Sequence, residues 1–244
     1  MEQKKLLLII PFYNEAHRMD RHEWEVAFTA YPDTTFLLVD DGSTDGTHTL
    51  LEDLGSRFNN VMPMRLTQNA GKAEAVRRAV LSNSAQRFDF DYIGYMDADL
   101  ATPVSELIKM KQYADEHPHF TFLMGSRIKK LGSNIIRYGH RHYFGRVFAT
   151  IASKFILRDA VYDTQCGAKI LHTKLALDLF ASPFITRWIF DVELLLRYKK
   201  QKGNLDGIYE YSLTSWTEMG KSKITLKDLL GFPWQLIKIY QAYV

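Results

Sequence analysis

Two aspartates separated by a single residue are the first feature of the sequence that could carry chemistry. Asp97-Ala98-Asp99 directly follows the apolar run 92–96. Two carboxylates at this spacing in an irregular loop can converge on one hard cation, and Mg²⁺ or Mn²⁺ held by oxygen ligands also bridges to phosphates. Most pairs of this kind are surface loops or helix caps. The position at the end of an apolar strand is what favours a metal site here.

A second acidic segment, residues 39–47, reads Val-Asp-Asp-Gly-Ser-Thr-Asp-Gly-Thr. A carboxylate at a strand end, such as Asp41, can accept hydrogen bonds from a base or a ribose. Gly42 permits a tight turn at this point. The alternative is a helix-capping loop, in particular for Asp45.

The third segment, Asn69-Ala70-Gly71-Lys72, is predicted to open a helix. The unpaired N–H groups of a helix start, next to a lysine, suit a phosphate. The segment is not a Walker A loop, because the spacing of that motif is absent.

Short apolar runs precede these polar loops and are expected to position them. Strands are predicted at residues 6–10 (ended by Pro11), 35–39, 61–66, 92–96 and 121–125. Helices are predicted from a cap at Ser43 or Thr44 to about Arg57, and over 73–84, 104–117 and 191–202. This alternation is typical of a doubly wound parallel sheet, in which ligands bind beyond the carboxyl ends of the strands. We therefore expect the chemistry near Asn14, Asp41, Asp97 and Asp99.

Composition excludes several classes of protein. Apolar residues make up 46 % and charged residues 24 % of the 244 residues, as in ordinary globular domains, and the net charge of +3 is too small to indicate nucleic acid as a partner. The single cysteine, Cys166, allows no intrachain disulfide and fits a reducing compartment. No run reaches the roughly 18 apolar residues of a membrane span, so we expect a soluble or peripheral protein.

Basic residues gather in segment 127–158, which favours a phosphate-bearing ligand or an anionic membrane, with a solvated helix face as the alternative. Residues 140–158 are predicted to form an amphipathic helix. Residues 226–244 are apolar with Lys227 and Lys238, and are predicted to be broken by Gly231 and Pro233. Both stretches could lie on a membrane surface or pack as core or dimer helices.

Taken in order, five segments resemble the family 2 glycosyltransferases with the GT-A fold: residues 11–15, 39–47, 69–72, 97–100 and 125–127. Four later segments resemble the dolichyl-phosphate β-glucosyltransferases, and more distantly the dolichyl-phosphate mannose synthases: residues 163–167, 187–195, 215–218 and 222–224. The resemblance spans residues 6 to about 230. Ala168 and Lys221 depart from the family pattern, which has an aromatic residue and a glycine there.

The resemblance implies an α/β GT-A fold, with a Rossmann-like, mostly parallel sheet flanked by helices in a single domain. The nucleotide-binding half would span about 5–128, the acceptor half about 129–225, and the amphipathic segment 226–244. It implies an inverting transfer of a sugar, expected to be glucose, from UDP-glucose to a polyprenyl or dolichyl phosphate, with Mg²⁺ or Mn²⁺ as cofactor.

The same resemblance assigns roles to individual residues. Metal ligands would be Asp97 and Asp99. Donor-binding residues would be Pro11, Tyr13, Glu15, Asp41, Lys72, Asp97 and Lys223. Catalytic residues would be Asp99, Arg127 and Asp191, and acceptor-binding residues Arg127 and Arg141.

Two alternatives remain open. A soluble enzyme with a saccharide or lipid-linked hydroxyl acceptor would use Asp191 as general base, whereas in phosphate transfer Asp191 would orient or merely cap its helix. A nucleotide-sugar binding module without activity is the other. The eukaryotic relatives carry an N-terminal membrane helix, whereas this chain starts at the catalytic strand, which departs from the family and leaves membrane attachment open. The expected location is cytoplasmic, with peripheral attachment to the inner face of the membrane as the open alternative. The oligomeric state is left open.

Overall fold

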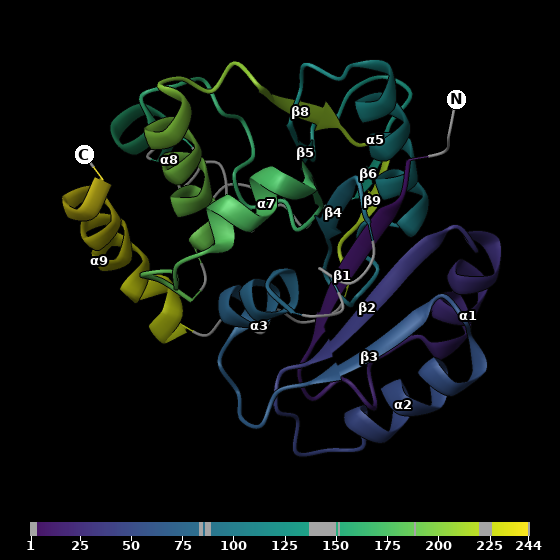
Figure 1. Cartoon of the computed structure of the whole chain (residues 1–244). Coiled ribbons are helices and arrows are strands. Elements are labelled where there is room, and N and C mark those ends of the chain that lie inside the picture. The colour runs from purple at the N-terminus through teal and green to yellow at the C-terminus, as the bar shows by residue number, and fades with distance from the viewer. Residues whose placement is uncertain are drawn as a thin grey trace.

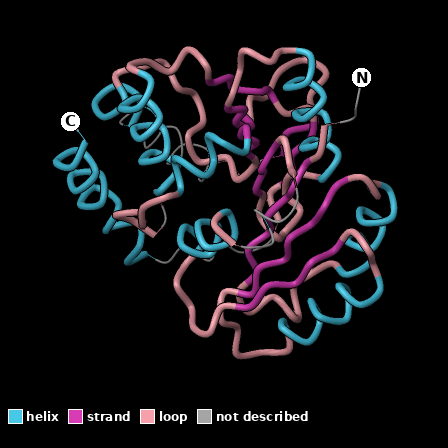
Figure 2. Tube along the Cα trace, in the orientation of Figure 1, coloured by secondary structure: helices cyan, strands magenta, loops and turns pink. Residues whose placement is uncertain are grey.

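The computed structural model describes residues 4–82, 85, 89–136, 150, 152–187, 189–219 and 226–243. Its centre is a seven-stranded sheet in the order β3-β2-β1-β4-β7-β5-β8 (Figures 1 and 2). The strands are β1 (Leu6–Phe12), β2 (Thr34–Asp40), β3 (Val61–Arg65), β4 (Tyr92–Tyr95), β5 (Phe122–Ser126), β7 (Lys169–His172) and β8 (Ile208–Ser212). A separate parallel pair joins β6 (Asn134–Ile136) to β9 (Ser215–Thr217).

Helices cover both faces of this sheet (Figure 1). They are α1 (Arg21–Ala30), α2 (Thr47–Arg57), α3 (Lys72–Val80), α5 (Val104–Glu116), the short π-helix η1 (Ala152–Leu157), α7 (Thr173–Phe180), α8 (Phe190–Lys202) and α9 (Leu226–Tyr243). Leu7 and Ile9 of β1 lie in the core shared with α3, α7, α8 and α9. Leu8 and Ile10 lie in the opposite core, with α1, α2 and α5. Burial on both faces explains why this strand is a continuous apolar run.

The predicted strands and the mostly parallel α/β architecture are confirmed, with small shifts of the strand ends. The first strand does not end at Pro11, as predicted, but continues to Phe12. Pro11 and Phe12 pair with Val39 and Asp40 of β2, so the strand is held from that side. The sheet is mixed, because β7 runs antiparallel to both of its neighbours, β4 and β5.

Other helix predictions need correction. Neither Ser43 nor Thr44 caps α2, which begins after Gly46 without a side-chain capping bond. Asp191 does not cap α8 either, since the N-cap is Ile189 and no side chain caps it. The sequence pattern missed α7 altogether.

The C-terminal segment is one helix, α9, that runs through Gly231 and Pro233, although a break was predicted. Leu236 and Ile239, which follow the proline, are buried against η1 and α8. This tertiary packing opposes the cost of an internal proline, about 3 kcal/mol. Among the described residues no helix is both long and apolar enough to cross a bilayer.

Of the amphipathic helix predicted at 140–158, only residues 150 and 152–158 are described, and 152–157 form η1.

Candidate active site

The loop that carries the two aspartates leaves the sheet at the carboxyl end of β4. The Met96 N–H donates to the Ile9 carbonyl at 3.1 Å. Two residues farther along β1, Pro11 has no N–H with which to continue this ladder. The chain therefore departs after Met96. The Trp24 indole donates to the Ala98 carbonyl at 3.2 Å and anchors the loop on α1.

Asp97 lies between a lysine and a glycine. Lys72 Nζ is 2.5 Å from Asp97 Oδ1, and the Asp97 side chain remains 46 % exposed. On the other side, a Cβ added to Gly167 would stand 2.0 Å from Asp97 Oδ2, so only glycine leaves room. Desolvation alone would raise the pKa of Asp97, but Lys72, Lys169 and Arg127 outweigh it and lower that pKa. Asp97 is thus an anion that a ligand can reach.

Asp99 stands beside Asp97 in the same loop, where Leu100 adopts a left-handed φ of 55° and the Ala101 N–H donates to Asp99 Oδ1 at 3.0 Å. Partial desolvation raises the pKa of Asp99, the Asp97 charge adds to this, and Glu15 contributes a smaller effect in the same direction. Mutual repulsion between carboxylates is relieved when a cation binds between them.

The donors and charges at this loop fit a divalent cation. Among the described residues no group of three or more His, Cys, Asp and Glu side chains surrounds a metal position. Mg²⁺ is commonly held by one or two carboxylates and completes its shell with water and substrate phosphates. Asp97 and Asp99 match that pattern, and Lys72 already places a positive charge against Asp97.

Asp41, buried at the carboxyl end of β2, organises the segment that leads to Lys72. The N–H groups of Ala70 and Gly71 each donate to its carboxylate at 2.8 Å, and the Asn69 amide donates at 3.0 Å. Asp41 therefore uses the N–H groups of Ala70 and Gly71, which precede α3, and a phosphate at the start of that helix beside Lys72 stays a prediction. Burial raises the pKa of Asp41 against the effect of these donors.

The loop after β1, which contains Tyr13 and Glu15, is joined to the loop after β2. Three of its N–H groups donate to side chains there: Asn14 to Ser43 at 3.0 Å, Glu15 to Thr47 at 2.8 Å and Ala16 to Asp45 at 3.1 Å. Asp45 thus links the two loops and is more than a helix cap. These bonds keep Tyr13 and Glu15 at the edge of the sheet where Asp97 and Asp99 lie.

Arg127, at the end of β5, is held by a carboxylate. Its Nε and Nη2 each donate to Asp163 at 2.7 Å, and its guanidinium lies 5.2 Å from the Trp216 ring centroid. Asp163 raises the pKa of Arg127 despite the opposing effect of burial. Arg127 is therefore a fixed positive charge, and its field reaches Asp97.

Asp191 belongs to a buried ion pair. Lys169 Nζ lies 2.8 Å from Asp191 Oδ1, and the Tyr95 hydroxyl donates to the same oxygen at 2.7 Å. Lys169 is fully buried and also donates to the Cys166 carbonyl at 2.6 Å. Burial raises the pKa of Tyr95, and the adjacent carboxylate raises it further, so Tyr95 stays a donor.

Arg141 and Lys223 lie outside the described residues. The structure brings together Glu15, Lys72, Asp97, Asp99, Arg127 and Asp191, which act on one another electrostatically.

Sequence reasoning missed the roles of Asp163, Gly167 and Lys169. The first two stood in a segment quoted for the resemblance, without a role of their own. Lys169 had a usable signal: it is a charged residue at the start of an otherwise apolar strand, and a lysine there must find a buried partner.

Comparison with known proteins identifies the family of this chain. Residues 7–179 match glycosyl transferase family 2. The dolichyl-phosphate beta-glucosyltransferase of Mus musculus is 32 % identical, with 98 % of this chain and 80 % of the relative covered. The protein of the same name from Drosophila melanogaster is 30 % identical, with 91 % and 69 % covered.

Solved structures show the same fold at low sequence identity. Glucosyl-3-phosphoglycerate synthase from Mycobacterium tuberculosis, in complex with Mn²⁺, UDP and glucosyl-3-phosphoglycerate, has a TM-score of 0.71 at 17 % identity and covers 98 % of this chain and 80 % of its own. Mannosyl-3-phosphoglycerate synthase from Rubrobacter xylanophilus also has a TM-score of 0.71, at 16 % identity, with 97 % and 73 % covered. The fold is thus that of the GT-A glycosyltransferases, and the chain belongs to glycosyl transferase family 2.

Proposed function

We propose that this glycosyltransferase moves glucose, with inversion, from UDP-glucose to a dolichyl or other polyprenyl phosphate, with Mg²⁺ or Mn²⁺ bound at Asp97 and Asp99. The observation that carries the proposal is the pairing of these two carboxylates at the carboxyl end of β4, with Lys72 Nζ 2.5 Å from Asp97. The names of the relatives support the sugar and the acceptor. The Mn²⁺–UDP complex of a protein with the same fold supports the cofactor and the nucleotide.

On the donor side, Asp97 and Asp99 would hold the cation, which when bound supplies a Lewis acid for the diphosphate. Lys72 keeps its charge, because Asp97, Asp191 and Asp99 raise its pKa against the effect of burial. Its ammonium can therefore exchange Asp97 for a phosphate oxygen of the donor. Pro11, Tyr13, Glu15 and Asp41 border the same edge of the sheet, which fits a site for the nucleoside.

On the acceptor side, a phosphate monoester is already an anion and needs no strong general base. One of its oxygens would form a bond to the anomeric carbon of glucose as the bond from that carbon to the UDP oxygen breaks. A single displacement of this kind inverts the configuration. Arg127 supplies positive charge on the acceptor side, held in place by Asp163.

Asp191 fits a positioning role better than that of a base or nucleophile. Its Oδ1 pairs with the Lys169 ammonium and accepts a hydrogen bond from the Tyr95 hydroxyl, and the residue is 3 % exposed. A hydroxyl acceptor would need a free base at this point, so this geometry favours the phosphate acceptor.

The test is an assay of the purified chain with Mg²⁺, radiolabelled UDP-glucose and a short polyprenyl phosphate, following label into the organic phase. Transfer should require the metal and disappear with EDTA. Asp99→Ala should lower turnover about a hundred-fold or more without unfolding the chain, because a metal ligand contributes several kcal/mol to the transition state. Asp206→Ala, at an exposed loop acid, is the matched control.

Absence of transfer from UDP-glucose in the wild type would overturn the proposed donor or acceptor. Normal turnover of Asp99→Ala at saturating Mg²⁺ would overturn the metal assignment alone. The expected cytoplasmic location, the two functional halves of the domain, and the roles of Arg141 and Lys223 stay predictions.

A further inference from the structure

Helix α9 carries apolar side chains on two faces. Leu236 and Ile239 are buried, at 6 % and 0 % exposure, against η1 and α8. Toward solvent, Trp234, Ile237 and Tyr240 are 62 %, 45 % and 40 % exposed. A surface helix of a globular domain normally buries its apolar stripe against the core. An apolar stripe that extends this far onto the exposed side marks a contact with something outside the described chain.

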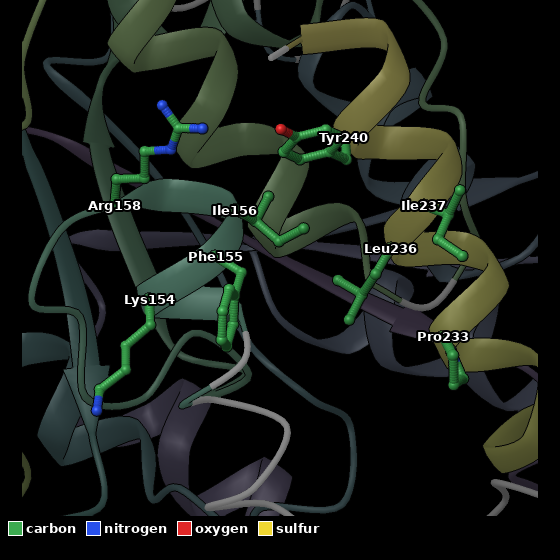
Figure 3. Close-up of a pocket in the computed structure, with 8 residues that line it drawn as sticks. All are labelled: Lys154, Phe155, Ile156, Arg158, Pro233, Leu236, Ile237 and Tyr240. Atoms are coloured by element: carbon green, nitrogen blue, oxygen red, sulfur yellow. The ribbon is translucent and has the colours of Figure 1, made fainter.

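The exposed stripe continues onto η1. Phe155 of η1, at 66 % exposure, also lines the groove between the two helices. The two helices enclose a groove of about 530 Å³, lined by Lys154, Phe155, Ile156, Arg158, Pro233, Leu236, Ile237 and Tyr240 (Figure 3). In Figure 3 the apolar side chains line the middle of the groove, and Lys154 and Arg158 point away at opposite ends.

The charged side chains that line this groove, Lys154 and Arg158, are both cations. Lys154, Arg158 and Lys238 are exposed, and among the described residues none of them forms a salt bridge. The nearby acid Asp159 is paired with Lys199 at 2.5 Å. A second copy of the chain docked on this face by two-fold symmetry would bring these cations together, which is unfavourable. The charge therefore favours an anionic partner.

We propose that η1 and α9 form a docking surface for a bilayer that contains anionic lipids. Trp234, Tyr240 and Phe155 would enter the interfacial layer, where aromatic side chains are stabilised, and Lys154, Arg158 and Lys238 would meet lipid phosphates. The inference rests on this surface and is independent of the proposed reaction.

The test is flotation of the full chain with vesicles of phosphatidylcholine, with and without phosphatidylglycerol, in the absence of sugar nucleotide and polyprenyl phosphate. We expect binding to the anionic vesicles that falls with salt. Lys154→Gln/Arg158→Gln should weaken it roughly twenty-five-fold at low salt, since each cation near the surface contributes about five-fold. Phe155→Ser/Trp234→Ser should weaken binding at all salt concentrations.

Matched controls lie on the far side of the molecule, where α1 and the N-terminus are found (Figure 1). Val26→Ser removes an apolar side chain of 48 % exposure, and Lys5→Gln removes an exposed cation. Both should bind like the wild type. A blue shift of tryptophan fluorescence on adding anionic vesicles, lost in Trp234→Phe, would place the helix in the bilayer.

Equal binding by the groove variants and the controls, or no binding to anionic vesicles, would overturn the proposal. Self-association that Phe155→Ser/Trp234→Ser abolishes, without vesicle binding, would show instead that a second copy covers this face. Because the assay contains no substrate, its result is separate from that of the transfer assay.

Discussion

At the scale of single residues, Asp97 depends on neighbours that do not themselves need to touch a substrate. Gly167 leaves the space that its carboxylate occupies, and Lys72 balances its charge at 2.5 Å. Lys169 and Asp191 form a buried pair whose field reaches both Asp97 and Lys72. The orientation of one carboxylate is thus set by groups from three separate parts of the chain.

Gly167→Ala tests this dependence. The new Cβ would stand 2.0 Å from Asp97 Oδ2, so the carboxylate must move. Since a displacement of about 1 Å at a reacting group can cost about a hundred-fold in rate, we expect a loss of that order in transfer. Metal affinity should fall as well, while circular dichroism stays native. Gly231→Ala in α9, whose Cβ meets no atom closer than 3.7 Å, is the control and should keep full activity.

Lys169→Met tests the buried pair. Removing Lys169 leaves the buried Asp191 carboxylate without its cation, and we expect a loss of about 3–5 kcal/mol in the free energy of unfolding by urea. Lys169→Met/Asp191→Asn should recover part of that loss, because no buried charge is left unpaired. Arg78→Met, which breaks a more exposed pair with Glu74, should cost less than about 1 kcal/mol.

The activity of Asp191→Asn distinguishes positioning from base catalysis. A positioning role predicts that the pH profile of the rate keeps its shape while the rate falls. Loss of the acid limb of that profile, with stability unchanged, would show that Asp191 acts as a base.

At the scale of elements, the site is built where the loops after β1, β2 and β4 meet. Hydrogen bonds tie the first two loops together, and Trp24 of α1 anchors the third. The antiparallel strand β7 sits between β4 and β5 and brings Lys169 beside Tyr95, its register partner. Insertion of β7 therefore connects β4, which precedes Asp97, to β5, which precedes Arg127.

His172, at the other end of β7, makes the stability of the folded chain depend on pH. Burial lowers the pKa of His172 below its ordinary 6.5 and Lys4 lowers it further, against Asp91 and Asp115. Its Nε2 has no hydrogen-bond partner within the part of the chain that is described. The unfolded chain therefore binds the proton more readily than the folded one, and stability is lost as the pH falls through about 6.5.

Urea unfolding at a series of pH values checks this. His172→Gln should reduce the change in the free energy of unfolding between about pH 7 and 5. His22→Gln, at an exposed position of α1, should leave that change as it is in the wild type. An identical slope in the wild type and His172→Gln would contradict this account.

At the scale of the whole molecule, two hydrophobic cores pack on opposite faces of one sheet. They hold the strands in place, and with them the carboxyl-end edge from which the site loops leave. Helix α9 packs onto one of these cores and leaves Trp234, Ile237 and Tyr240 exposed. The candidate active site and the proposed lipid-docking surface are thus both attached to the same sheet. Ligand binding at the candidate active site should therefore stabilise the entire fold.

Thermal unfolding measures this linkage. UDP at about a hundred times its Kd should add about 2.7 kcal/mol to the free energy of unfolding when Mn²⁺ is present. Without a divalent cation the gain should be much smaller. Asp99→Ala should show the smaller gain in both conditions. An equal gain with and without Mn²⁺ in the wild type would contradict the shared metal–nucleotide site.

The sequence by itself determined five strands of the central sheet, β1 to β5, and the loops that follow them, but it did not place β7 or β8. Apolar runs bounded by Pro, Gly and Asp are local signals, and they correctly placed Asp41, Asp97 and Asp99 at strand ends. The alternation of strands and helices then indicated the α/β fold, because neighbouring parallel strands carry their loops to one edge.

Only the tertiary structure decided what those side chains contact. Asp191 meets Tyr95 across 96 residues of chain, and Asp163 meets Arg127 across 36. Such pairs depend on strand order and on the direction of β7, which hydrophobic periodicity does not encode. For the same reason the sequence did not reveal that Asp41 accepts hydrogen bonds from the amides of Ala70 and Gly71. A buried donor bonds to whichever acceptor the fold brings within reach.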